Sequence, residues 1–314
     1  MFRVEKMDRK RLFAAILLAI TITVSCAARA AEYVPTAEWE PPVIDEEEAL
    51  RSAPWLLVLK VAQEEIGYVE GPRKDESKYG EWFGDIRTAW CAEFLTWCVN
   101  QADERYGTSL MDQVYPYYGH PKDGAPWFIE RERFISSTGK LPTTGEKMWL
   151  DGADHYLKNK EYIPQTGDYL WIAYYSPKKG TDHVALVEGV SLEPDGTFLI
   201  HVIEGNNPDR VQRNTYDQKW KLIYGYGTPV RRASRIIRTW NRSDDCKVIM
   251  RFLGELGFLK EYQVSDQFTD KGSEALIRYQ KQNGIKATGT VDMETRAFLE
   301  QDPLYQQLLA ETQR

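Results

Sequence analysis

The hydrophobic pattern is clearest in residues 89–102, which read AWCAEFLTWCVNQA. Apolar side chains recur there at the spacing of one helix face, at Cys91, Leu95, Cys98, Val99 and Ala102. A run with two glycines precedes this pattern, so Cys91 is expected at or near the helix N-terminus. Unpaired amide groups and the positive end of the helix dipole favour a thiolate there. A buried core cysteine is the competing interpretation.

Further patterns predict the elements around this helix. Residues 54–67 begin with a proline and end at a glycine, as helices commonly do. Four runs rich in β-branched and aromatic residues predict strands over 168–174, 183–190, 197–204 and 221–226. Because connections this short join antiparallel strands, helices followed by such a meander predict an α+β fold.

The stretch 107–165 is different, with five prolines and little periodicity outside an amphipathic piece over 146–159. We expect an insertion or lid there. Its Trp127, Phe128 and Phe134 either line a substrate groove or belong to the core.

The N-terminus predicts secretion. A basic segment precedes an almost unbroken apolar run over 12–24, and Ala28-Arg29-Ala30 offers a cleavage site, so residues 1–30 are predicted to be a signal peptide. An uncleaved anchor and lipidation at Cys26 are the alternatives. Residues 31–50, with three prolines and an acidic run, are predicted to be an exposed linker.

The net charge and the number of cysteines limit the classes of function that we expect. Removing residues 1–30 takes away six basic and two acidic residues and moves the formal net charge from −7 to −11. An acidic protein without a basic cluster is not expected to bind nucleic acid or, after signal cleavage, a membrane. Cys91, Cys98 and Cys246 remain, and an odd count suggests a free thiol. A Cys98–Cys246 disulfide stays open, although Cys98 faces the core side of its helix.

Trp90-Cys91-Ala92-Glu93-Phe94, followed by Trp97-Cys98, resembles the nucleophile helix of the CHAP family, the cysteine- and histidine-dependent amidohydrolases/peptidases. The run over 78–84, KYGEWFG, is similar to the segment upstream of the nucleophile in that family. The resemblance implies a papain-like α+β domain, here residues 51–230 with the insertion near 107–165. It also implies a histidine on a downstream strand and a carboxylate or amide that orients it.

Both expected partners occur in the chain. His183 begins the second predicted strand, within Thr181–Val187, which is similar to the histidine signature of the family. Glu204-Gly205-Asn206 ends the next strand and resembles the family's Glu-x-Asn element. Adjacent antiparallel strands would bring the start of one beside the end of the other. His201, in mid-strand, is interpreted as structural.

The resemblance assigns roles to these residues. Cys91 attacks an amide carbonyl as a thiolate, His183 moves the proton, and Glu204, sometimes helped by Asn206, holds the imidazole. The backbone N–H of Cys91 is the natural oxyanion donor, and Tyr79 is a candidate second donor. Asp75-Glu76 is not a recognisable calcium loop, so we expect neither metal nor cofactor.

The C-terminal part shows short helical patterns after a predicted linker over 231–245. Residues 246–301 resemble the three-helix peptidoglycan-binding module, through 256–259, 279–285 and 288–295, with a degraded turn over 267–270. Residues 302–314 are predicted to be a polar helical tail.

The two resemblances together imply a monomeric, secreted cell-wall hydrolase that cleaves an amide bond in peptidoglycan. N-acetylmuramoyl-L-alanine amidase and peptidoglycan endopeptidase activities remain equally open. The rival interpretations are a non-catalytic cell-wall-binding protein and a papain-like peptidase acting on protein substrates.

Overall fold

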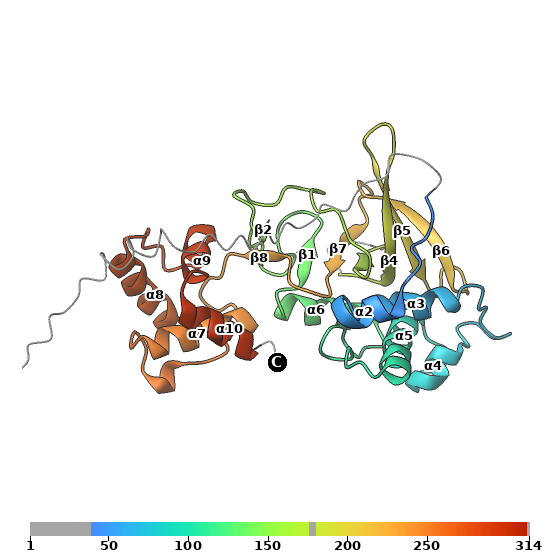
Figure 1. Ribbon diagram of the computed structural model, residues 1–314, viewed down its shortest axis with the longest axis horizontal. Coiled ribbons are helices and arrows are strands. Elements are labelled where there is room, and N and C mark those ends of the chain that lie inside the picture. Colours follow the sequence, from blue (N-terminus) through green and yellow to red (C-terminus); the bar gives the residue numbers. More distant parts are fainter. Residues whose placement is uncertain (1–38, 176–179, 313–314) are drawn as a thin grey trace, which may run out of the picture. The chain divides into compact units, whose positions relative to one another are not determined.

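The computed structural model describes residues 39–175 and 180–312. Within these ranges, an α+β region over 46–235 is followed by a helical region over 244–312 (Figure 1). The predicted fold class is confirmed. The predicted signal peptide and Cys26 lie outside the described residues.

The first helices are α2 (Glu46–Ser52) and α3 (Leu56–Glu64). Asp45 caps α2 by accepting a hydrogen bond from the Glu48 backbone N–H at 2.8 Å, and three glutamates occupy the first turn. Acidic residues stabilise a helix N-terminus. The acidic run that we interpreted as linker is therefore, in its second half, the start of a helix.

Helices α4 (Lys78–Phe83) and α5 (Cys91–Tyr106) follow. Ser77 caps α4, and each helix ends at a glycine in the left-handed conformation that a residue without a side chain adopts most easily. Helix α5 starts at Cys91, as predicted, and packs against α3 and two strands of the main sheet.

The main sheet is antiparallel, with strand order β1-β7-β3-β4-β5-β6. Its members are β1 (Phe134–Ser136), β3 (Tyr169–Ile172), β4 (His183–Leu192), β5 (Phe198–Glu204), β6 (Gln212–Asp217) and β7 (Ile223–Gly227). Helix α5 lies against β4 and β5, so the helix and these two strands share one apolar core (Figure 1). Strands β1 and β6 were not predicted.

The stretch 107–165 is part of the domain rather than a separate lid. It forms α6 (Pro121–Glu130), edge strand β1 and the short strand β2 (Met148–Leu150). Phe128 and Phe134 are buried in the core, so they do not line a substrate groove. The amphipathic piece over 146–159 contains the strand β2. The predicted linker over 231–245 contains β8 (Ala233–Arg235), which pairs with β2 in a two-stranded antiparallel sheet.

The helical region consists of α7 (Asp244–Glu255), the short 3₁₀ helix η2 (Glu261–Gln263), α8 (Asp270–Asn283), α9 (Met293–Leu299) and α10 (Pro303–Thr312). Ser243, Thr269 and Asp292 cap α7, α8 and α9 through their side chains. The tail is helical as predicted, but Tyr305 and Leu308 of α10 are buried in the core of this region. Of the described residues, none forms a helix long and apolar enough to cross a membrane.

Candidate active site

Cys91 is the first residue of α5, and its side chain is only 2% exposed. Trp90, just before it, is buried and donates its indole N–H to Glu70 Oε2 at 2.8 Å. Gly205 lies directly on this indole, where a Cβ would come within 2.6 Å of ring carbon Cζ3. Only glycine allows such an approach, so the end of β5 is held close to the start of α5. Among the described residues, Cys91, Cys98 and Cys246 are all free.

His183 is the first residue of β4, and it is nearly as inaccessible, at 5% exposed. The two residues before it form hydrogen bonds that hold the start of β4 in place. Thr181 Oγ1 donates to the backbone carbonyl of Ile172 at 2.7 Å, and the Asp182 carboxylate accepts hydrogen bonds from the backbone N–H groups of Tyr174 and Tyr175. His183 therefore stands on a rigid strand end, opposite Ile172 of β3.

Glu204, the last residue of β5, is completely buried and bonds His183 directly. Its Oε2 lies 2.6 Å from His183 Nε2. Strands β4 and β5 pair so that Leu186 faces Ile203, which brings the first residue of one strand beside the end of the other. The predicted juxtaposition of these two side chains is present in the structure.

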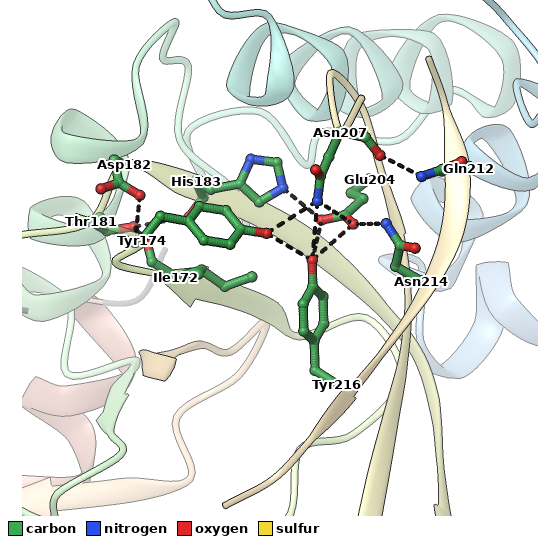
Figure 2. Close-up of polar contacts among 10 residues, drawn as sticks. All are labelled: Ile172, Tyr174, Thr181, Asp182, His183, Glu204, Asn207, Gln212, Asn214 and Tyr216. Carbon is green, nitrogen blue, oxygen red and sulfur yellow. Dashed lines mark hydrogen bonds and ion pairs between the residues drawn. The ribbon is translucent and has the colours of Figure 1, made fainter. Parts of the chain in front are cut away.

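Three further groups donate to the Glu204 carboxylate (Figure 2). Asn207 Nδ2 and the Tyr216 hydroxyl each lie 2.9 Å from Oε1, and Asn214 Nδ2 also bonds Oε1. Hydrogen bonds favour the charged form of a buried carboxylate. Glu204 can thus hold a positive imidazolium without a cationic side chain in direct contact.

The protonation of His183 reflects these neighbours. Burial by itself lowers its pKa, but the charge of Cys91 and hydrogen bonds to Cys91 and Glu204 outweigh it and raise the pKa to about 10. Because Nε2 is held by Glu204, Nδ1 is the nitrogen left for Cys91. The His183 imidazole therefore has Glu204 at one nitrogen and Cys91 at the other.

Two other candidate residues lie elsewhere. The Asn206 amide donates to Asp75 Oδ1 at 3.2 Å, and the neighbouring Asn207 is the residue that contacts Glu204. Asn206 has a φ of 57°, and this left-handed turn points consecutive side chains in different directions. The Tyr79 hydroxyl donates to Glu65 Oε2 at 2.6 Å, so it is engaged away from the nucleophile.

Asn214 and Tyr216 were missed by the sequence analysis because β6 was missed. The strand reads QRNTYD, and its alternate residues Gln212, Asn214 and Tyr216 are partly buried while those between are exposed. This period-two alternation of burial is typical of a strand, but the sequence does not show it because the inward-facing residues are polar as well.

The remaining histidines have other surroundings. His201 lies between Ser191 Oγ and Thr215 Oγ1 and stacks on Trp39, with ring centroids 3.9 Å apart. In the part of the chain that the structure describes, no group of three or more His, Cys, Asp or Glu side chains could hold a metal ion.

Comparison with known families agrees with this geometry. Residues 83–206 match the CHAP domain, and residues 242–299 match a peptidoglycan binding domain. The chain thus contains a CHAP domain with a peptidoglycan-binding domain C-terminal to it. These domains support a cell-wall hydrolase in general, with peptidoglycan as partner and an extracellular or cell-wall location.

More distant comparisons add little. None of the curated proteins matches the chain. Two solved structures resemble it weakly. Ly7917 is 15% identical with a TM-score of 0.28, over 56% of this chain and 62% of its own. A periplasmic domain of the EpsAB fusion protein of the Vibrio vulnificus type II secretion system is 14% identical with a TM-score of 0.20, over 53% of this chain and 70% of its own.

Proposed function

We propose that the protein is a secreted peptidoglycan hydrolase that cleaves an amide bond, with Cys91 as nucleophile, His183 as general base and acid, and Glu204 as the residue that orients the imidazole. The single observation that supports this most is the buried 2.6 Å contact between His183 and Glu204, with Cys91 as the second hydrogen-bond partner of the same imidazole. The match to the CHAP domain also supports the proposal, because Cys91, His183 and Glu204 all lie within the matched residues 83–206.

The steps follow from the positions of the atoms. Cys91 Sγ attacks the amide carbonyl carbon, and the oxyanion binds the free N–H groups at the start of α5. His183 gives its proton to the leaving amine, the C–N bond breaks, and a thioester remains. Water, deprotonated by His183, then attacks the thioester. The C–S bond breaks, the carboxylate product leaves, and the thiolate–imidazolium pair is restored.

Amidase and endopeptidase activities are both compatible with this chemistry. Mass spectrometry of digested peptidoglycan identifies the bond. New free lactyl carboxylates on the glycan indicate an amidase, whereas shortened stem or cross-bridge peptides indicate an endopeptidase. A chain that binds cell walls and releases nothing would support the non-catalytic alternative, and cleavage of protein substrates alone would support a papain-like peptidase.

The nucleophile is tested by paired serine variants. Cys91→Ser should lower the rate of wall lysis by about 10⁴-fold or more, because the poorer nucleophile lacks a thiolate. Cys98→Ser is the matched control on the same helix. It should keep activity and lose about 1–3 kcal/mol of stability, since it places a hydroxyl at a buried position. An inactive Cys98→Ser with an active Cys91→Ser would show that the nucleophile is wrongly assigned.

A further inference from the structure

Three aromatic side chains lie beside the His183–Glu204 pair. The Tyr216 ring stacks on Trp220, with centroids 5.1 Å apart and planes inclined by 8°. Tyr174 meets Trp220 edge-on at 5.7 Å, and its ring centroid is 5.5 Å from that of His183. We call Tyr174, Tyr216 and Trp220 the aromatic platform. Two successive ring contacts, from His183 to Tyr174 and from Tyr174 to Trp220, connect it to the imidazole.

The aromatic platform is partly open to solvent. Tyr174 is 39% exposed, its neighbour Tyr175 is 87% exposed, and a depression of about 520 Å³ is lined by residues 215–217 and 219–221. Large aromatic groups left accessible next to a catalytic pair commonly form part of a binding surface. Tyr216 and Trp220 are partly buried against the apolar core, which leaves part of each side chain accessible.

The aromatic platform is also held in place before any ligand arrives. The Trp220 backbone N–H donates to the Asp217 carbonyl at 2.8 Å, and the Trp220 carbonyl accepts from Lys160 Nζ at 3.1 Å. The hydroxyls of Tyr174 and Tyr216 lie 3.0 Å apart, as Figure 2 shows. A preorganised surface loses little conformational entropy on binding.

These features decide between a peptide and a sugar as the occupant. Proteins grip extended peptides largely through backbone hydrogen bonds, but both backbone groups of Trp220 are already engaged. What the aromatic platform offers instead is flat apolar ring surface with hydroxyls at its edge. A pyranose ring has matching chemistry, since its C–H face is apolar and its substituents hydrogen-bond. The exposed Lys219 and Lys221 complement carboxylates carried near such a sugar.

We propose that the aromatic platform is a subsite for an N-acetylated amino-sugar ring of the peptidoglycan strand. The assignment rests on the function proposed above and sharpens it. A sugar on Trp220 is separated from His183 by two ring contacts, so an amide that reacts at His183 is close to the glycan. This places the cleavage at the amide that joins the sugar's lactyl group to the first amino acid.

The test measures binding without turnover, in a Cys91→Ala background of the full chain. Calorimetry compares a soluble disaccharide-tetrapeptide with the free tetrapeptide of the same sequence. Trp220→Ala in this background should weaken the disaccharide-tetrapeptide about tenfold and leave the free tetrapeptide unchanged. Trp220→Phe, which keeps a flat ring, should retain most of the affinity.

Two results would overturn the proposal: an undiminished affinity of Trp220→Ala for the disaccharide-tetrapeptide, or an equal loss for both ligands. If Trp220→Ala fails to fold, Trp220→Leu keeps apolar volume without the flat ring and carries the same expectation. Failure of the parent protein to hydrolyse any muropeptide would count against the proposed function, while the binding comparison would still test the subsite.

Discussion

Two buried glutamates near Cys91 have opposite surroundings. Glu204 accepts hydrogen bonds from His183, Asn207, Asn214 and Tyr216. Glu93, two residues after Cys91 on α5, is equally buried, but in the described part of the chain its side chain accepts only from Thr88 Oγ1, at 3.1 Å. Its Oε2 has no hydrogen-bond partner among the described residues.

The difference shows that burial alone does not decide what a carboxyl group does. Four donors stabilise the charge of Glu204, which can then hold an imidazolium. Burial raises the pKa of Glu93 to about 7, so about half of these groups are protonated at neutral pH. It packs against Gly80, where a Cβ would lie 2.9 Å from Glu93 Oε2, and so supports the segment that leads to the nucleophile.

Among variants of these two glutamates and of their partners, the largest effect is expected from Glu204→Gln. Removing the negative charge beside His183 should lower the pKa of the imidazolium from about 10 and move the alkaline limb of the pH–rate profile to lower pH. We expect kcat to fall about a hundredfold, less than in Cys91→Ser. Steady-state rates between pH 5 and 10.5 measure both. An unmoved alkaline limb here, with a large shift in Asn206→Ala, would transfer the orienting role to Asn206.

A smaller effect is expected from Asn214→Ala, which removes one of the four groups bonded to Glu204. The free energy of unfolding should fall by about 1–3 kcal/mol, because a buried carboxylate loses a donor, and kcat/KM should fall several-fold. Asn206→Ala is the matched control, since its amide bonds Asp75 instead. Urea denaturation of both variants provides the comparison. Equal losses would show that the contact with Glu204 stabilises the fold no more than the contact with Asp75 does.

The smallest effect on activity is expected from Glu93→Gln. This variant should instead change how the free energy of unfolding depends on pH. The folded-state pKa of Glu93 is raised from 4.5 to about 7, so the stability that neutral Glu93 contributes is fully present below pH 4.5 and is lost as pH rises through about 7. Glutamine stays neutral. The variant should therefore lose less stability than the parent between pH 5 and pH 8, measured by urea denaturation. Parallel curves for the two proteins would contradict this.

The sequence predicted the elements whose inward faces are apolar. Helix α5 and strands β4 and β5 were placed within a few residues of their observed bounds, and with them Cys91, His183 and Glu204. Strand β6 was missed because its inward face is polar, to match Glu204, and so lacks the hydrophobic alternation on which strand prediction depends. Asn207 was missed because the direction of a side chain in a turn depends on backbone angles, such as the positive φ of Asn206, that composition does not reveal.

Strand β6 makes the site depend on the pairing of an edge strand. It is one of the two edge strands of the main sheet and pairs there with β5 alone, yet it supplies two of the groups that hold Glu204. A slip of one residue in this pairing would turn Asn214 and Tyr216 to the opposite face and leave the carboxylate short of donors. The site thus depends on correct pairing at an edge of the sheet, and a molecule in which this edge is frayed would be well packed but poorly active.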